Sequence, residues 1–316
     1  MAAEAKKMFR KSITLGTVQF GLPYGIMNEQ GQVSPDDARD IIYAAVSGGV
    51  SYIDSAAAYG SSEAIVGSSI EKINAAGVNV ISKLEPFSNA ILASLDEKTL
   101  RDQVRFSVLR SLDRMRVESI QCLMLHRAHH LYNEILVSEL MRLKQAGMFK
   151  ELGVSVQSVD ELILAIEDLS ITVIQMPTNI LDYRWETVSH LISDRKKIKP
   201  LTVHGRSALF QGLLTAFDAD KWHRLGFENS SKIVNWMLKI EKQTKIPFVE
   251  LCLRYVASKP WIDSIVIGVQ TEGQLKQNML QLSKPALQES TMDQIDSTRP
   301  YIGEHNLNPS NWKTNV

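Results

Sequence analysis

Cysteine and net charge are two things that this sequence of 316 residues has little of. Its two cysteines, Cys122 and Cys252, lie far apart in apolar stretches, which favours two buried reduced thiols over a disulfide framework. Lysine plus arginine and aspartate plus glutamate each number 35, so no bulk charge directs the protein toward nucleic acid or an anionic membrane. A small molecule is therefore the expected partner.

Long hydrophobic runs are also missing. No segment approaches the roughly 18 apolar residues of a membrane span, and the basic start MAAEAKKMFRKS is not followed by the apolar run of a signal peptide. A cytoplasmic location is the default expectation. No low-complexity linker interrupts the chain, so residues 1–316 are expected to form one domain.

What the sequence does contain is one unit that recurs along the chain: a short apolar run, a loop, and a longer stretch with helical spacing. The runs are ITLGTV (13–18), SYIDS (51–55), VNVISKL (78–84), IQCLMLH (120–126), FKELGVSV (149–156), ITVIQMP (171–177), KPLTVHG (199–205) and DSIVIGV (263–269). Alternating strands and helices imply a parallel sheet with right-handed crossovers. Eight units in about 270 residues fit a closed (β/α)8 TIM barrel better than an open doubly wound sheet.

Helix starts are recognisable between the runs. SPDD at residues 34–37 offers a serine cap, a proline at the first helical position and an early acid, and Gly48 and Gly49 end this helix. SVDELILAIEDL, residues 158–169, repeats the serine cap and early acids before an apolar stripe. Both segments are expected to be helices that follow strands.

Two regions depart from the simple repeat. Between Gly205 and Asp263 two helical segments are expected in place of one, which predicts extra helices in the seventh loop. After Gln288 we expect one short helix and then a polar tail. The tail either forms a C-terminal flap over one barrel mouth or frays.

Catalytic groups of such barrels lie at the carboxyl ends of the strands. Asp54 ends the second run with Tyr59 just beyond it in DSAAAYG, Lys83 lies near the end of the third, and His126 ends the fourth. A lysine held against an aspartate stays protonated and favours ionisation of a neighbouring phenol, whose unperturbed pKa is about 10. Such a phenol donates a proton to a carbonyl oxygen, and a histidine orients that oxygen. The small residues between Asp54 and Tyr59 are expected to give clearance for this arrangement.

These residues resemble a known family. DSAAAYG, the lysine of ISKL and the histidine of LMLH are similar in order and spacing to the catalytic residues of the aldo-keto reductases, and further matches run from LGTVQFG to IVIGVQTEGQLKQN. The resemblance implies an NAD(P)(H)-dependent oxidoreductase that reduces an aldehyde or ketone to the alcohol by hydride transfer. By similarity, Tyr59 is the general acid, Lys83 tunes it, Asp54 anchors Lys83, and His126 orients the substrate oxygen.

The resemblance also implies a cofactor site. Ser155 and Gln175 match residues that hold the nicotinamide carboxamide in the family, although Val156 removes one expected amide contact. Arg206 occupies the place of a tyrosine that stacks on the nicotinamide, and a guanidinium is planar as well. The residues expected to bind the cofactor are Gly16, Thr17, Ser155, Gln175, Arg206, Ser207, Leu209, Gly212, Gly268, Gln270, Gln274 and Asn278.

The motif GVQTEGQLKQN bears on the choice of cofactor. By similarity, Gly268 and Asn278 belong to the phosphate-binding turn and helix start. Where the family often has a basic residue for the adenosine 2′-phosphate, this chain has Gln270 and Gln274, with only Lys276 nearby. NADPH is the family default, and NADH is the alternative.

Substrate shape depends on the loops, where Phe20, Tyr24, Phe87 and Asn179 are candidate substrate contacts. LGTVQFGLPYGI is similar to family members from surface-sugar and nucleotide-sugar pathways, which favours a sugar carbonyl and a role in carbohydrate metabolism. The sequence predicts no oligomeric state.

Two other functions stay open. Val156 and Arg206 would suit a nicotinamide-binding sensor or regulatory subunit with little turnover. The HRAHH run raises a metal-dependent barrel hydrolase, but the first strand lacks the paired histidines that such enzymes use, so no metal is expected.

Overall fold

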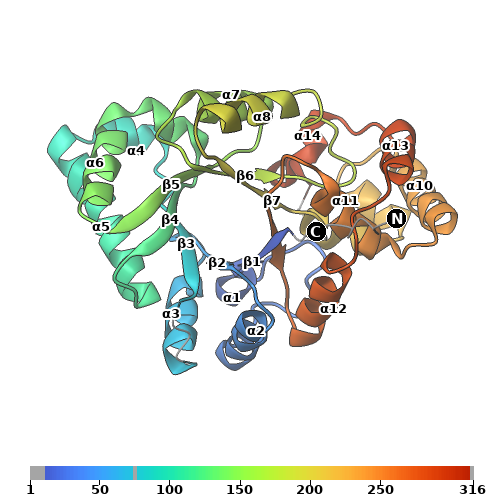
Figure 1. Cartoon of the computed structure of the whole chain (residues 1–316), viewed down its shortest axis with the longest axis horizontal. Coiled ribbons are helices and arrows are strands. Elements are labelled where there is room, and N and C mark those ends of the chain that lie inside the picture. The colour runs from blue at the N-terminus through green and yellow to red at the C-terminus, as the bar shows by residue number, and fades with distance from the viewer. Residues whose placement is uncertain (1–10, 74–76, 314–316) are drawn as a thin grey trace, which may run out of the picture.

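The computed structural model describes residues 11–73 and 77–313, in which parallel strands close into a barrel (Figure 1). The strands are β1 (Ser12–Gly16), β2 (Tyr52–Asp54), β3 (Asn79–Lys83), β4 (Ile120–Leu125), β5 (Phe149–Ser155), β6 (Val173–Pro177), β7 (Thr202–Arg206) and β8 (Ser264–Gly268). Each pairs in parallel with the next, and β8 pairs with β1, with Gly16 opposite Gly268. The predicted (β/α)8 barrel is confirmed.

Helices surround the barrel (Figure 1). The α-helices of the described residues are α1 (Val18–Gly21), α2 (Pro35–Ser47), α3 (Ser62–Lys72), α4 (Asn89–Ser94), α5 (Glu97–Met115), α6 (Glu134–Gln145), α7 (Val159–Glu167), α8 (Ser189–Ile198), α9 (Ala219–Arg224), α10 (Ser230–Thr244), α11 (Phe248–Ser258), α12 (Glu272–Leu282), α13 (Glu289–Thr298) and α14 (Glu304–Leu307). The 3-10 helices are η1 (Ala128–Tyr132), η2 (Phe210–Thr215) and η3 (Pro309–Asn311). Because the strands are all parallel, their carboxyl ends meet at one mouth of the barrel.

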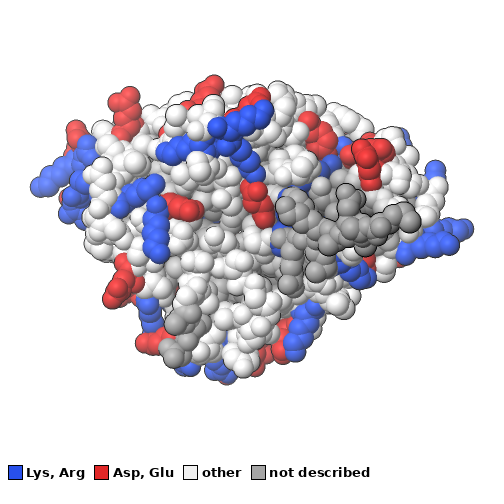
Figure 2. Space-filling model, viewed as in Figure 1, with Lys and Arg blue, Asp and Glu red and all other residues white. Residues whose placement is uncertain are grey.

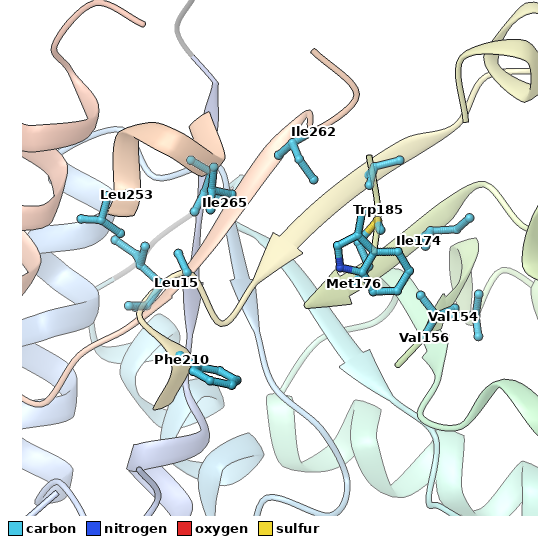
Figure 3. Close-up of a cluster of buried hydrophobic side chains, with 14 of the residues drawn as sticks. Leu15, Val154, Val156, Ile174, Met176, Trp185, Phe210, Leu253, Ile262 and Ile265 are labelled. Carbon is cyan, nitrogen blue, oxygen red and sulfur yellow. The ribbon is translucent and has the colours of Figure 1, made fainter. Parts of the chain in front are cut away.

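The strands are buried on both faces. On the outer face, side chains such as Leu15, Val154 and Ile174 pack under the helices, and Figure 3 shows them with Trp185 and Phe210. Alternate residues face inward, where the barrel is filled by a separate cluster of Ile81, Cys122, Met124 and Val173. Both cysteines of the chain are buried free thiols, as expected. Two-sided burial explains why most residues of the runs are apolar, and the charged pair Lys150 and Glu151 lies near the start of β5, where Lys150 is exposed.

The predicted helix starts are confirmed. Ser34 Oγ accepts the Asp37 N–H at 3.1 Å at the start of α2, and Gly49 follows that helix in the left-handed region with φ +83°. At α7, Ser158 Oγ accepts the Glu161 N–H at 3.2 Å. Each such cap stabilises a helix by about 1 kcal/mol.

The seventh loop carries more helices than expected. Two helical segments are predicted in residues 205–263, but the structure has α9, α10 and α11, so the predicted number is wrong. Lys245 adopts a left-handed conformation (φ +56°) and Pro247 caps the next helix, which divides one stretch into α10 and α11. α10 lies outside the barrel near α13 (Figure 1), where Trp236 Nε1 donates to Thr298 Oγ1 at 3.0 Å.

The described part of the tail forms a flap at the barrel mouth. Trp312 is buried against Phe210, with ring centroids 4.8 Å apart, and its Nε1 donates to the Asn306 carbonyl at 2.8 Å. Residues 308–310 thereby reach the cavity described below. Of the two expectations for the tail, the flap is the one observed; residues 314–316 lie outside the described part.

Charge is mixed over the surface. Figure 2 shows Lys and Arg interspersed with Asp and Glu on the visible face, in line with the balanced composition. Among the helices of residues 11–73 and 77–313, none has the length and hydropathy needed to cross a bilayer. One domain over residues 1–316 stays a prediction, and residues 1–10, 74–76 and 314–316 lie outside the described part.

A histidine is buried inside the barrel on β7. His204 is 2 % exposed, and burial lowers its pKa from 6.5 to about 4 despite the opposing charges of Asp54 and Asp263. The unfolded chain therefore takes up a proton near pH 6.5 that the folded chain rejects until about pH 4. Between about pH 6.5 and pH 4 the fold should lose about 1.4 kcal/mol of stability per pH unit from this residue.

Urea unfolding at pH 7 and at pH 5 measures this dependence. We expect His204→Gln to flatten the loss of stability at pH 5 relative to the parent protein. His223→Gln is the matched control, because His223 is exposed on α9. Equal losses in the parent protein and in His204→Gln would show that His204 does not titrate as expected.

Candidate active site

A cavity of about 780 Å³ opens at the carboxyl ends of the strands. Strand ends, the loops that follow them, α12 and the tail form its wall. The predicted site residues that line it are Gly16, Thr17, Tyr24, Asp54, Tyr59, His126, Ser155, Gln175, Arg206, Ser207, Leu209, Gly212, Gly268, Gln270, Gln274 and Asn278. One cavity therefore gathers most of the residues that the sequence singled out.

Lys83 ends β3 and forms a buried ion pair with Asp54. Its Nζ donates to both carboxylate oxygens of Asp54 at 2.7 Å and to the Ser55 carbonyl at 3.1 Å. Lys83 is 1 % exposed and Asp54 3 %. Burial alone would lower the pKa of Lys83, but the charges of Asp54 and Tyr59 raise it, and the net pKa lies above its ordinary value. Lys83 is therefore a cation at neutral pH.

Tyr59 lies next to this ion pair. Lys83 Nζ is 5.0 Å from the centroid of the Tyr59 ring, which meets the His126 ring edge to face at a centroid distance of 5.7 Å. The chain before Tyr59 stays bonded to β3, because the Ala57 N–H donates to the Lys83 carbonyl at 3.0 Å. The chain then turns back, and the Tyr59 N–H donates a hydrogen bond to the Ala56 carbonyl at 3.0 Å. Both alanines are buried, so small side chains allow this close path.

Two glycines fix the position of the Tyr59 loop against α1. A Cβ on Gly21 would lie 1.7 Å from the Tyr59 carbonyl oxygen. A Cβ on Gly60 would lie 2.4 Å from the Gly21 carbonyl oxygen, and Gly60 has φ +54°. Neither position accepts a side chain unless the loop moves.

Gly21→Ala should therefore displace Tyr59. We expect kcat to fall by about 100-fold, the usual cost of a shift near 1 Å, and the fold to lose about 1–3 kcal/mol by overpacking. Steady-state kinetics and urea unfolding measure the two effects. Gly303→Ala is the control, since a Cβ there meets nothing within 4 Å. If both variants behave alike, the Gly21 contact does not position the loop.

His126 follows β4 and lines the cavity beside Tyr59. Burial lowers its pKa from 6.5 to about 3, and the charges of Lys83, Arg127 and Arg206 act in the same direction. The ring is thus neutral at physiological pH and donates from one nitrogen only. Its Nδ1 is buried and bonds to nothing in the described part of the structure. A neutral imidazole of this kind suits a hydrogen bond to a carbonyl oxygen.

Ser155 ends β5, and Gln175 lies opposite it in register on the neighbouring strand β6, two residues before that strand ends at Pro177. Gln175 is 1 % exposed, and its Nε2 donates to Asp54 Oδ1 at 3.3 Å, which fixes the orientation of the amide. Thr17 follows β1 at the same mouth of the barrel. Its N–H and its Oγ1 both donate hydrogen bonds to the Asp54 carbonyl, at 3.0 and 2.9 Å. Gln175 thus bonds to the side chain of Asp54, and Thr17 bonds to its backbone carbonyl.

Arg206 ends β7 and reaches across the mouth to the loop after β5. Its Nη2 donates to the Val156 carbonyl at 3.2 Å and to Gln157 Oε1 at 2.9 Å. Burial lowers the pKa of Arg206, although arginine stays charged at any physiological pH. The chain then turns sharply, with φ +63° at Ser207 and φ +89° at Gly212. These residues and Leu209 line the cavity.

The turn after β8 leads into the N-terminus of α12. Thr271 Oγ1 caps this helix by accepting the Gln274 N–H at 3.2 Å, and the Gln270 N–H donates to Gln274 Oε1 at 2.8 Å. Gly268 lies close to another side chain, because a Cβ there would be 2.8 Å from Gln19 Oε1. Backbone N–H groups at such a helix start favour an anion.

Three of the candidate substrate contacts do not line the cavity. Phe20 is fully buried in the core. The Phe87 carbonyl accepts a hydrogen bond from His130 Nε2 at 2.9 Å, and Asn179 Oδ1 accepts a backbone N–H two residues on. The structure corrects the expectation for these residues, whose side chains serve core and loop packing, and leaves Tyr24 in the cavity wall.

The HRAHH run forms no cluster of metal ligands in the described residues. Within residues 11–73 and 77–313, no three His, Cys, Asp or Glu side chains are grouped so that they could hold a metal ion. The rings of His129 and His130 meet at a centroid distance of 4.6 Å, and His130 bonds to the loop of Phe87. Both take part in packing this loop.

Comparison with known proteins decides the family. The family model described as "Aldo/keto reductase family" matches residues 12–300. The chain belongs to this family. Membership supports carbonyl oxidoreduction on a small-molecule substrate, and aldo-keto reductases typically use nicotinamide cofactors.

Two kinds of relative accompany the family match. D-arabinose 1-dehydrogenase of Saccharomyces cerevisiae is 25% identical over 269 residues, which cover 79% of this chain and 78% of that protein. The solved aldo-keto reductase AKR11C1 from Bacillus halodurans, in its holo form, has a TM-score of 0.75 at 20% identity and covers 92% of this chain and 93% of its own. The glycerol dehydrogenase AKR11B4 from Gluconobacter oxydans has a TM-score of 0.68 at 22% identity, with 90% of each chain covered. Both solved structures support the aldo-keto reductase barrel fold.

This aldo-keto reductase has cavity residues that the sequence did not single out. Gln19 and Gln157 directly follow the apolar runs of β1 and β5, a position that could have drawn attention to them. Gln19 Oε1 and Gln157 Nε2 are buried and bond to nothing in the described residues. Glu161 Oε2 accepts the Gln157 N–H at 2.5 Å. Residues 308–310 had no local signal, because they reach the cavity only through the folded tail.

Proposed function

We propose that the protein reduces an aldehyde or ketone to the alcohol with a nicotinamide dinucleotide and with Tyr59 as the proton donor. The observation that carries the proposal is the contact of Tyr59 with the buried pair of Lys83 and Asp54, with neutral His126 beside it. A fixed cation next to a phenol favours loss of the phenolic proton. The histidine then orients the oxygen that receives it.

Reduction adds a hydride to the carbonyl carbon and a proton to the carbonyl oxygen, and the cofactor supplies the hydride when bound. Tyr59 donates its proton as negative charge develops on that oxygen. Lys83 stabilises the phenolate that is left, and Asp54 keeps Lys83 charged and in place. His126 donates a hydrogen bond to the same oxygen. Solvent returns a proton to Tyr59 after the alcohol leaves.

The polar groups of the cavity fit a nicotinamide dinucleotide. Ser155 and Gln175 would hold the carboxamide, for which Ser155 has a hydroxyl with no bond to other described residues. Gln157 Nε2 is a buried donor without a partner in the described part of the chain, and a ligand oxygen would satisfy it. The turn at Gly268 and the start of α12 would hold the phosphates with backbone N–H groups.

NADPH is the proposed cofactor, and NADH is the alternative. The basic residue near the last motif, Lys276, is exposed and pairs with Glu272 at 2.5 Å. Gln270 bonds through its side chain to Asn28. A 2′-phosphate would have to compete with Glu272 for Lys276, and this competition weakens the preference for NADPH. Titration of the protein with both reduced cofactors decides between them.

A hydroxylated carbonyl such as a sugar is the proposed substrate. The relative from Saccharomyces cerevisiae is named for D-arabinose. Amide side chains, among them Asn28, Gln157 and Gln211, line the cavity and offer both donors and acceptors to hydroxyl groups. Carbohydrate metabolism is the corresponding role.

The experiment is to follow the nicotinamide absorbance of NADPH or NADH with a panel of aldehydes, ketones and sugars. We expect consumption of the cofactor, and faster consumption with hydroxylated aldehydes than with alkyl aldehydes of equal length. No consumption with any carbonyl, at substrate and cofactor concentrations that saturate related reductases, would contradict the proposal.

A nicotinamide-binding sensor or regulatory subunit is the second candidate. Val156 and Arg206 in the cavity wall favour it, because they differ from the residues common at these positions in the family. Tight cofactor binding with no turnover on the panel would support the sensor. Steady consumption of the cofactor would exclude it.

A further inference from the structure

We propose that Arg206 makes the cavity bind the reduced nicotinamide more tightly than the oxidised form. The proposal rests on the proposed function and assigns to one residue a preference for the redox state of the cofactor. It concerns a charge that the reduction mechanism itself does not use.

The guanidinium of Arg206 lies beside the residues proposed to hold the carboxamide. Strands β5, β6 and β7 are neighbours, with Ser155 opposite Gln175 on β5 and β6. Arg206 belongs to β7 and bonds to Val156 and Gln157 just beyond β5. Because β6 lies between β7 and β5, the side chain of Arg206 passes over the carboxyl end of β6, and Gln175, two residues before that end, lines the cavity. A ring held by Ser155 and Gln175 meets this guanidinium.

The charge of Arg206 has no counter-ion at close range. Within residues 11–73 and 77–313, no carboxylate forms an ion pair with its guanidinium, and its two hydrogen-bond acceptors are neutral. Asp54 and Glu161 act on it only through their longer-range charge. Asp54 is already bound by Lys83, and Glu161 accepts the Gln157 N–H. A net positive charge thus faces the cavity.

The two redox forms of the ring differ in the charge that Arg206 meets. The oxidised nicotinamide ring carries one positive charge, whereas the reduced ring is neutral. Two cations a few ångströms apart repel strongly in a partly desolvated site. A neutral planar ring instead stacks well on a guanidinium. The reduced cofactor should therefore bind more tightly, and the oxidised product should dissociate readily.

The test compares dissociation constants of NADPH and NADP⁺, or of NADH and NAD⁺ if that pair binds, by calorimetry. We expect the unaltered protein to bind the reduced form at least about tenfold more tightly, and Arg206→Gln to lower this ratio at least about tenfold. Arg206→Lys should keep most of the preference because it keeps the charge. Arg127→Gln is the control: Arg127 is an exposed cation of the same cavity, so solvent screens it and the ratio should hold.

Each outcome of this binding test supports or overturns the role proposed for Arg206. Equal binding of both forms by the unaltered protein, or an unchanged ratio in Arg206→Gln, overturns the proposal while leaving the proposed function intact. No binding of any nicotinamide dinucleotide overturns the proposed function as well. If Arg206→Gln binds neither form, Arg206→Met provides the second neutral variant. If Arg206→Met also binds neither the reduced nor the oxidised cofactor, Arg206 is needed for the structure of the site, and the proposal is contradicted.

Discussion

Tyr59→Phe should lower kcat for carbonyl reduction by about 100- to 10,000-fold, the range that a positioned proton donor contributes. The change removes only the phenolic oxygen, so the ring still meets His126 edge to face and still lies next to Lys83. Charge on the substrate oxygen then keeps the hydrogen bond from neutral His126 but receives no proton from Tyr59. Steady-state kinetics at saturating cofactor measure the effect.

Cofactor affinity separates loss of chemistry from loss of the site. The dissociation constant of the cofactor should stay within about threefold in Tyr59→Phe, because no proposed cofactor contact is removed. Tyr43→Phe is the matched control, since Tyr43 is 60% exposed on α2 and should leave both quantities unchanged. Turnover by Tyr59→Phe equal to that of the control would remove Tyr59 from the mechanism.

Lys83→Met should remove activity and also destabilise the fold by about 3–5 kcal/mol, because it leaves Asp54 as a buried charge without its partner. Asp54 is 3 % exposed and receives two hydrogen bonds from Lys83. Among the described residues, only the weak bond from Gln175 at 3.3 Å would remain on its side chain. Urea unfolding at pH 7 measures the loss of stability.

The double variant Lys83→Met, Asp54→Asn provides the control. Without the negative charge, the double variant should regain much of the stability that Lys83→Met loses, while activity stays absent. A double variant no more stable than Lys83→Met would show that the cost comes from packing and not from the unpaired carboxylate. Full activity in Lys83→Met would contradict the proposed role of the cation.

The strand ends at Asp54 and Lys83 could be read from the sequence because the strands before them are mostly apolar. Asp54 and Lys83 are charged residues at the end of such runs, and a buried charge requires a partner. Parallel strands bring their carboxyl ends to one mouth, so residues 29 positions apart meet there as an ion pair. The barrel and the Tyr59 region were predictable for this reason.

Contacts that depend on the exact path of loops could not be read in this way. Gly21 ends α1 and Gly60 follows Tyr59, and only their packed backbones show why neither accepts a side chain. Phe20 and Phe87 look like pocket aromatics in the sequence. In the folded protein, Phe20 is buried in the core and Phe87 packs within its loop, where its carbonyl accepts a hydrogen bond from His130. Trp312 brings the tail to the cavity through contacts far away in sequence.

Transfer of deuterium from a C4-deuterated nicotinamide cofactor to the carbonyl carbon of the substrate is the most direct measurement of the proposed reaction. We predict that the product alcohol formed by the unaltered protein carries the deuterium on its carbinol carbon, and that Tyr59→Phe gives almost none in the same time. Alcohol formed without deuterium from the cofactor, or labelled equally fast by Tyr59→Phe, would contradict hydride transfer with Tyr59 as the proton donor.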